Sequence, residues 1–171
     1  MKKTILLTVF MAALTVVAFS QDKSKRPSPP AVAEGTIDGV KIKVDYSQPA
    51  AKGRKVMGGL VPYGEVWRTG ANEATVIEFD KDVKIEGQAL AAGKYTLFTI
   101  PGESEWTVIF NKKIGQWGSY DYNKNKDQDA LQVKVKSGKA DMTESFTISV
   151  GKDVVTMKWE NTSVSFKVSK G

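Results

Sequence analysis

Short runs of alternating apolar and polar residues cover most of the chain after residue 34. In the segment 40–46, every second residue is apolar and the residues between them are charged. This period of two residues predicts a strand with one buried face. Comparable runs lie at 76–80, 94–101 and 105–111, and four more lie between 131 and 169. No segment has the sustained i, i+3, i+4, i+7 spacing of an amphipathic helix.

The runs recur at roughly 8–12-residue intervals and end at Gly, Asn or Asp, which is typical of an antiparallel sandwich or barrel. We therefore predict an all-β domain over residues 34–171, with about eight to ten strands in an antiparallel two-sheet sandwich, immunoglobulin-like or jelly-roll-like. A hairpin turn is predicted at Gly87. The last three runs predict a meander with tight turns at Gly151-Lys152 and Asn161-Thr162.

The N-terminal segment has the layout of a secretory signal peptide. Lys2 and Lys3 precede an apolar run at 4–17, and Ala18 and Ser20 place small residues at the −3 and −1 positions of a cleavage site. We expect residues 1–20 to be removed on export to the periplasm or the medium, which leaves no stable membrane anchor. The segment 21–33 is polar and proline-rich, and it predicts a flexible linker.

Composition excludes several kinds of chemistry. The chain of 171 residues contains no histidine and no cysteine, which removes Ser-His-Asp triads, cysteine nucleophiles, disulfides and thiolate or imidazole metal sites. There is no phosphate-binding glycine loop. The net charge of +6 is not gathered on one element, so we expect no nucleic-acid partner. We expect no cofactor and no metal, and we assign no catalytic residue. These features favour a binding protein over an enzyme.

Polar and aromatic side chains concentrate in the glycine-rich stretch 53–75, GRKVMGGLVPYGEVWRTGANEAT. Arginines offer bidentate donors to carboxylate or phosphate groups, and aromatic rings offer flat faces to a ligand. A second loop with Trp117, and Asn111 at the end of a run, could wall the same cleft. The predicted ligand-binding residues are Arg54, Tyr63, Trp67, Arg68, Asn72, Glu73, Asn111 and Trp117.

Each of these residues has a structural alternative. Trp67 alternates with Val66 and Arg68, which is also the pattern of a core tryptophan in a sandwich. Arg68 could be a buried structural residue, and Glu73 could pair with Arg68 or Arg54 and tie the loop to the sheet. In the segment 121–129, Asp and Asn alternate as in a calcium loop, but the glycine and glutamate that such a loop needs are missing, so we predict a solvated, mobile loop.

Three functions remain open. The leading hypothesis is an exported module that binds a small molecule or glycan. The second is a glycan hydrolase that uses Glu65 or Glu73 as its acid, because two carboxylates suffice for that reaction. The third is a structural or interaction protein of the cell envelope.

Two long segments resemble a bacterial family called domain of unknown function 2911. They are the segment 53–79, which contains GLVPYGEVWRTGANEAT, and the segment 90–122, which contains AGKYTLFTIPG and EWTVIFN. The resemblance covers the chain from about Gly35 to the C-terminal strands. It implies export and a β-rich fold, and it assigns no activity and no catalytic residues.

Overall fold

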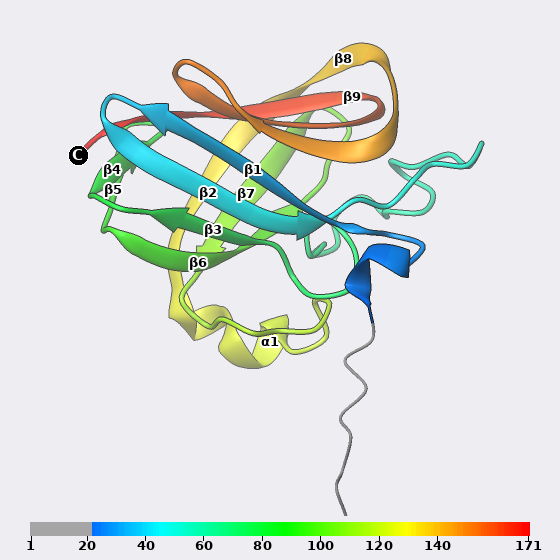
Figure 1. Cartoon of the computed structure of the whole chain (residues 1–171), viewed down its shortest axis with the longest axis horizontal. Coiled ribbons are helices and arrows are strands. Elements are labelled where there is room, and N and C mark those ends of the chain that lie inside the picture. The colour runs from blue at the N-terminus through cyan, green and yellow to red at the C-terminus, as the bar shows by residue number, and fades with distance from the viewer. Residues whose placement is uncertain (1–21) are drawn as a thin grey trace, which may run out of the picture.

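Nine strands account for most of residues 22–171, the part of the chain that the computed structural model describes (Figure 1). The predicted signal peptide at 1–20 lies outside the described residues. The strands are β1 (Pro30–Ile37), β2 (Val40–Ser47), β3 (Val76–Phe79), β4 (Val83–Ile85), β5 (Gln88–Leu90), β6 (Gly93–Ile100), β7 (Glu105–Asn111), β8 (Asp129–Val150) and β9 (Val154–Lys170). The helical segments are η1 (Lys23–Lys25), α1 (Tyr122–Asn125) and η2 (Lys126–Gln128).

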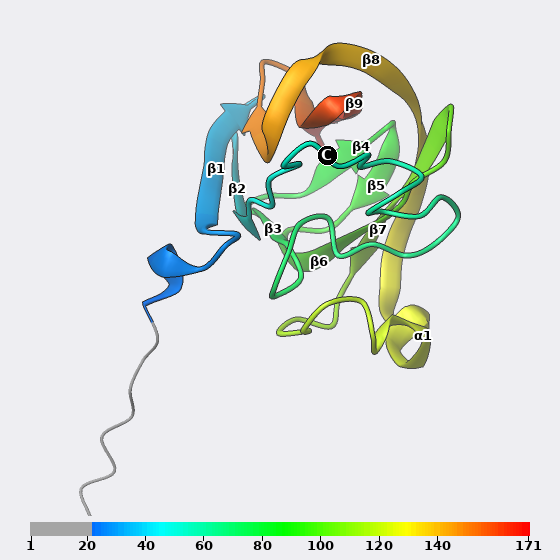
Figure 2. The same ribbon diagram turned by 90° about the vertical axis from the view of Figure 1, so that its right-hand side faces the viewer.

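All strand pairs are antiparallel, in the order β1-β2-β3-β6-β7-β8-β9-β4-β5. The predicted all-β antiparallel class is confirmed. The predicted division into two sheets is not found in the hydrogen bonding, because one continuous nine-stranded sheet links every strand. This sheet folds over itself, so that β1 and β2 face the hairpin of β8 and β9 (Figures 1 and 2).

The folded sheet is closed by contacts between its β1 end and β8. A Cβ atom at Gly35 of β1 would lie 2.6 Å from Cγ1 of Val150 at the end of β8, so the absence of a side chain allows this close approach. Just after β2, Ala51 N–H donates to Glu144 O at 2.8 Å. Strands far apart in the ladder therefore enclose one core, as the two layers of a sandwich do.

β8 and β9 are longer than the sequence predicts. The predicted turn at Gly151-Lys152 is present, and Gly151 N–H donates to Val154 O at 2.8 Å. The predicted turn at Asn161-Thr162 is wrong, because both residues lie inside β9. The polar residues there mark a bend instead. Glu160 has φ of 52°, and the pairing of β8 with β9 shifts register in the same region.

The core contains a cluster of aromatic rings between the two layers. Trp106 of β7, Phe146 of β8 and Trp159 of β9 are almost fully buried. A smaller cluster forms where α1 covers the outer face of β6 and β7, and there Tyr122 packs edge-on against Phe98 at 5.2 Å between ring centroids. The helical segment therefore protects sheet surface that would otherwise contact water.

The domain begins before the predicted boundary at residue 34. β1 starts at Pro30, so residues 30–33 of the predicted linker are paired with β2. The preceding residues contact the loop that contains Glu73. Among residues 22–171, no helix has the length and apolar character needed to cross a bilayer.

Candidate functional site

The stretch 53–75 runs across the end of the folded sheet that faces the viewer in Figure 2. It contains isolated bridges but no strand or helix. Val56 and Val61 are buried and anchor the stretch in the core. Val56 N–H also donates to Oε2 of Glu160 at 3.1 Å, at the bend of β9. The loop is therefore held in place by both apolar and polar contacts.

Trp67 is the core anchor of this loop. Its ring stacks on Trp159 with 5.8 Å between centroids and packs against Phe146 at 5.0 Å. Its indole N–H donates to Gly70 O at 3.0 Å, and its backbone exchanges hydrogen bonds with Thr99 of β6 at 2.8 and 3.0 Å. This packing agrees with the alternative that Trp67 is a core residue. Trp67 is only half-buried, however, and it also lines a pocket.

A strained turn follows Trp67. Thr69 is fully buried and has φ of 55°, a left-handed conformation that β-branched residues rarely adopt. Its hydroxyl lies 3.1 Å from that of Thr99, and Thr75 Oγ1 donates to Thr69 O at 2.6 Å. Such strain persists when surrounding contacts enforce it, and it is common at functional sites. The turn determines where Arg68 is placed.

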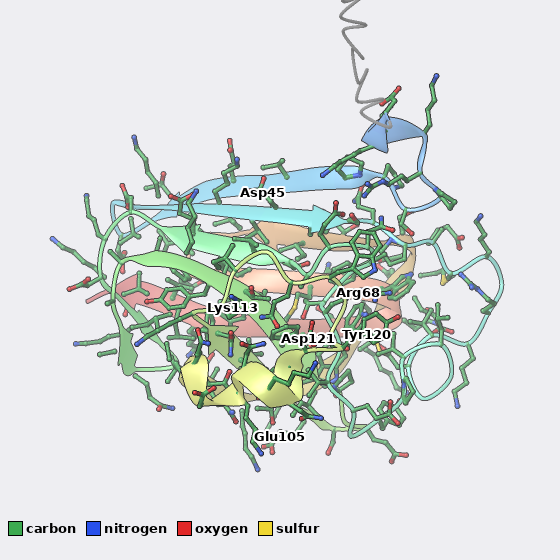
Figure 3. All side chains as sticks on the ribbon, turned by 90° about the horizontal axis from the view of Figure 1, so that it is seen from below. Asp45, Arg68, Glu105, Lys113, Tyr120 and Asp121 are labelled. Atoms are coloured by element: carbon green, nitrogen blue, oxygen red, sulfur yellow. The ribbon has the colours of Figure 1, made fainter. Side chains whose placement is uncertain are left out.

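Arg68 lines a pocket of about 280 Å³ and has no ion pair or side-chain hydrogen bond within residues 22–171. Its Nε is buried without an acceptor. The guanidinium reaches the second loop, because a Cβ at Gly118 would lie 3.0 Å from Arg68 Nη1 and 2.8 Å from a ring carbon of Tyr120. Figure 3 labels Arg68 and Tyr120 on the same side of the molecule. We call this cavity the Arg68 pocket; it is lined by Ser28, Pro49, Arg54, Leu60, Val61, Pro62, Glu65, Val66, Trp67, Arg68, Gly70, Ala71 and Trp159.

Arg54 lines the same pocket from the other side of the loop. Its Nε donates to Ala51 O at 2.9 Å, and Nη2 donates to Ala50 O at 2.8 Å. These bonds fix the side chain and leave Nη1 without a described partner. Glu65 is exposed at the rim and forms no described ion pair with either arginine. The pocket therefore has two guanidinium groups and one carboxylate.

Glu73 binds the N-terminal segment, so the structural alternative holds with other partners than the Arg68 or Arg54 named for it. Its carboxylate lies 3.0 Å from Lys23 Nζ and 2.9 Å from Arg26 Nη1. Partial burial opposes ionisation, but a backbone hydrogen bond and the two cations outweigh it and hold the pKa of Glu73 below its ordinary value. Glu73 is thus an ionised clamp, and the cations come from the segment predicted to be a free linker.

Asn72 completes this clamp. It has φ of 59°, a left-handed conformation that asparagine tolerates better than most residues. Its Nδ2 donates to Ser28 O at 3.0 Å and to Ser47 Oγ at 3.4 Å. The side-chain amide therefore joins the N-terminal segment to the end of β2.

Asn111 is a structural residue in the described fold. It is fully buried, and its Nδ2 donates to Asn125 O at 2.8 Å and to Asp129 Oδ1 at 2.7 Å. Its Oδ1 accepts from Lys113 N–H at 2.9 Å. With three partners it secures the connection between β7 and β8 and has little capacity left for a ligand.

The other two predicted residues lie apart from the Arg68 pocket. Tyr63 is 39% exposed, and its ring packs over Gly58 beside a different cavity. Trp117 is 55% exposed and pairs with Glu73 through an isolated β-bridge. Of the eight predicted residues, the Arg68 pocket therefore unites Arg54, Trp67 and Arg68.

Ser28, which lines the pocket, and Tyr120, which lies near Arg68 outside the lining, were not among the predicted residues. Ser28 lines the Arg68 pocket although it belongs to the predicted linker, and no sequence pattern marks it. Tyr120 lies in the glycine-rich aromatic loop and is 77% exposed. The glycines and aromatic residues of this loop were the feature of the sequence that could have identified Tyr120. Nearby, Gln116 Oε1 is buried without a described partner.

The segment 121–129 forms helical turns and not the predicted mobile loop. Asp121 pairs with Lys124 at 2.9 Å. Asp129 accepts hydrogen bonds from Tyr122 at 2.7 Å and Gln132 at 2.8 Å, as well as from Asn111. Its oxygen atoms thus have protein partners, and residues 22–171 contain no cluster of three acidic side chains able to hold a metal.

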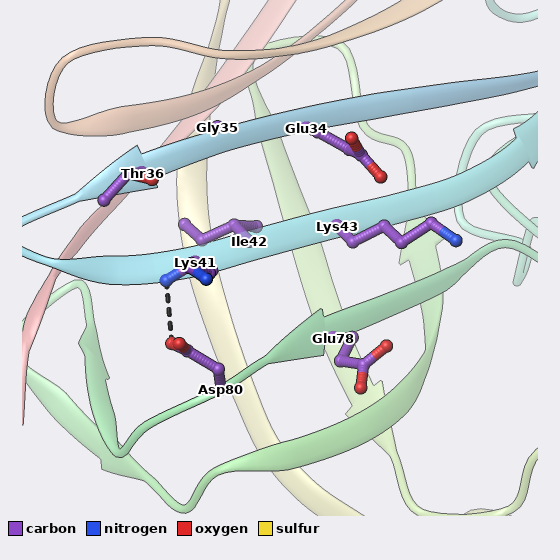
Figure 4. Close-up of a pocket in the computed structure, with 8 residues that line it drawn as sticks. All are labelled: Glu34, Gly35, Thr36, Lys41, Ile42, Lys43, Glu78 and Asp80. Carbon is purple, nitrogen blue, oxygen red and sulfur yellow. Dashed lines mark hydrogen bonds between the residues drawn. The ribbon is translucent and has the colours of Figure 1, made fainter.

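A larger hollow of about 530 Å³ lies on the outer face of β1, β2 and β3 (Figure 4). Its charged groups are largely paired within the fold. Asp80 accepts from Lys41 N–H at 2.7 Å, and Glu78 lies 3.2 Å from Lys94. Its side chains spread along the strand faces, as expected for a solvated sheet surface. We therefore take the smaller Arg68 pocket as the candidate site.

A known protein family matches the chain over nearly the whole of the folded sheet. The sequence matches the family described as Protein of unknown function (DUF2911) over residues 28–168. The chain belongs to this family. The match begins at Ser28, in the segment docked beside the Arg68 pocket, and it extends from before β1 to Val168 near the end of β9. No curated protein and no solved structure matches the chain.

Proposed function

We propose that this protein is an exported module that binds a small molecule with a carboxylate or phosphate group in the Arg68 pocket. The observation that carries the proposal is the guanidinium of Arg68, whose Nε is buried without an acceptor. The guanidinium as a whole forms no ion pair and no side-chain hydrogen bond within residues 22–171, and an anionic ligand would supply an acceptor for it. Arg54 lines the same cavity and adds a second positive charge.

The volume and lining of the pocket support a small ligand. About 280 Å³ is near the lower end of ligand-site volumes, which begin at roughly 300 Å³. Trp67 and Trp159 add apolar surface beside the charged groups. An acidic sugar or another small organic acid has both the charge and the apolar surface that this arrangement requires.

Binding explains these contacts better than glycan hydrolysis. A catalytic acid needs a raised pKa so that it is protonated when the reaction begins. The pKa of Glu73 is lowered, and both of its oxygens are engaged by Lys23 or Arg26. Glu65 is exposed at the rim and has no second carboxylate in the pocket lining. Export remains part of the proposal on the strength of the N-terminal sequence pattern.

Isothermal titration with phosphate, sulfate, benzoate, succinate and glucuronate tests the proposal. At least one anion is expected to bind saturably, and Arg68→Ala should abolish binding while changing the melting temperature by only a few degrees. Arg68→Lys should restore part of the affinity, since it keeps the charge and loses the bidentate geometry. Lys55→Ala is the matched control, because Lys55 is an exposed cation of the same stretch outside the pocket lining.

Two results would overturn this assignment. One is that none of these anions binds to the folded protein. The other is that Arg68→Ala unfolds the domain and Arg68→Lys folds but binds every anion as tightly as the original protein. The second result would make Arg68 a structural residue.

A further inference from the structure

We propose a second binding site, on the other side of the 56–63 loop, for a neutral hydroxyl-rich ring such as a monosaccharide. A separate cavity of about 290 Å³ lies there, beneath the ring of Tyr63. It shares no lining residue with the Arg68 pocket. The inference therefore does not depend on the proposed anion site.

Trp106 lines this cavity and carries an unpartnered donor. Trp106 is only 2% exposed, and its indole N–H has no hydrogen-bond partner within residues 22–171. The neighbouring indoles differ, because Trp67 donates to Gly70 O and Trp159 donates to Glu144 O. Buried tryptophan N–H groups usually have a partner, and leaving one unpaired costs free energy. A ligand oxygen that reaches Nε1 from the cavity would satisfy Trp106.

The rest of the lining favours a neutral ligand with hydroxyl groups. The polar residues are largely uncharged, namely Ser104, Ser137, Asn161 and Thr162. Their side chains can both donate and accept hydrogen bonds, and a hydroxyl group also does both. Glu103 and Lys139 contribute one charge of each sign, so the lining has no net charge to attract an anion.

An aromatic face completes the match to a sugar ring. Tyr63 is 39% exposed at this cavity and rests on Gly58, where a Cβ would lie only 2.6 Å from its ring. A pyranose has an apolar C–H surface besides its hydroxyls, and the flat face of a tyrosine can cover it. Small-ligand sites combine apolar surface with placed polar groups, and here Met57, Tyr63 and Trp106 supply the apolar part.

The walls of this cavity are held by the bend of the β8–β9 hairpin. Lys139 pairs with Thr162, and the register shifts immediately beyond that pair. Glu160, at the bend, holds the backbone of Val56 in the loop. Asn161 is exposed beside the bend and its side chain forms no described hydrogen bond. The irregular pairing thus opens space between β9 and the loop while both remain anchored.

Titration of the ¹⁵N-labelled domain with glucose, galactose and N-acetylglucosamine at millimolar concentration tests the site. The indole N–H signals of the four tryptophans report on separate positions, and Trp106→Phe identifies the signal of Trp106. We expect that signal to shift saturably with at least one sugar. The indole signals of Trp67 and Trp159 should move less, because their N–H groups already have protein acceptors.

Asn161→Ala should weaken sugar binding roughly five- to tenfold, the effect of one lost hydrogen bond, and it should leave the melting temperature unchanged. Asn123→Ala is the matched control, since Asn123 is exposed on another part of the surface. Arg68→Ala should leave sugar binding intact, which separates this site from the anion site. The proposal is overturned if no sugar shifts the Trp106 signal, or if Asn161→Ala and Asn123→Ala bind sugar equally well.

Discussion

Arg26 donates from Nη1 to Oε2 of Glu73 at 2.9 Å, and this contact joins the segment before β1 to the loop that carries Arg68. The same segment is held by Asn72, which donates to Ser28 O. Ser28 in turn lines the Arg68 pocket. Residues of the predicted linker are therefore part of the candidate site. Their attachment to the loop depends on the ionisation of Glu73.

Glu73→Gln should remove part of the pH dependence of stability. The pKa of Glu73 is lowered in the folded state, so its contribution is present above the ordinary glutamate pKa of about 4.3 and is lost as pH falls through the folded value. The unfolded chain binds the proton first, which favours unfolding in acid. Because the group is half exposed, the effect at neutral pH should stay below about 1 kcal/mol.

Melting temperatures of both proteins between pH 3 and pH 7 measure this difference. The original protein should lose more stability than Glu73→Gln on acidification. Hydrogen exchange should also show less protection of the backbone N–H groups of Arg26 and Ser28 in the variant at neutral pH, since Pro27 and Pro29 have none. Parallel pH profiles with equal protection would contradict the clamp.

Trp67→Ala should destabilise the domain by about 3 kcal/mol, near the low end for a buried tryptophan because the ring is half exposed. The substitution removes the stack on Trp159 and the edge contacts with Phe146 and Trp106. Urea denaturation measures the loss. The control Trp117→Ala removes a ring that is 55% exposed and should change stability by less than about 0.5 kcal/mol. Equal losses in the two variants would show that Trp67 is not a core anchor.

Asn111→Leu should cost about 2–4 kcal/mol, since it leaves several buried polar groups without their partner. The substitution keeps a similar side-chain size, but it removes the bonds to Asn125 O, Asp129 and Lys113 N–H. Chemical denaturation again provides the measurement. Stability close to that of the original protein would contradict the structural role and return Asn111 to the candidate ligand residues.

Tyr122→Phe should flatten the loss of stability at high pH. Burial, and then the hydrogen bond to Asp129 and its charge, raise the pKa of Tyr122 well above its ordinary value. Above about pH 10 the unfolded chain loses this proton while the folded protein retains it, so stability falls as pH rises toward the folded pKa. Melting temperatures from pH 8 to pH 11 should therefore decrease more steeply in the original protein. Identical slopes in the two proteins would exclude a shifted Tyr122.

Several strands were predictable because local alternation specifies them. The run 40–46 lies within β2, and the turn at Gly87 joins Ile85 of β4 to Gln88 of β5. The bend in β9 was misread as a turn, because Asn161 and Thr162 suit a turn locally. Both lie within β9, where Thr162 pairs with Lys139 of β8, and such pairing between distant residues is not visible in a single strand's sequence.

The candidate site was only partly predictable. Glycines and polar residues identified the loop that carries Arg68, since such composition is common in functional loops. The partners of its charged residues could not be predicted, because Arg54 and Arg68 are nearer to Glu73 in the sequence, yet Glu73 binds Arg26, 47 residues away. Ion pairing depends on distance in space, which the chain's order does not specify.

The sequence by itself determined that this protein is an antiparallel β domain of the DUF2911 family, because strand periodicity and family motifs are local properties. It also excluded histidine and cysteine chemistry, since neither residue occurs. Only the tertiary structure decided that the sheet folds over itself, that Trp67 packs in the core, and that the indole N–H of Trp106 and Nε of Arg68 are buried without described partners. Burial and hydrogen bonding depend on which distant segments meet, and folding alone brings them together.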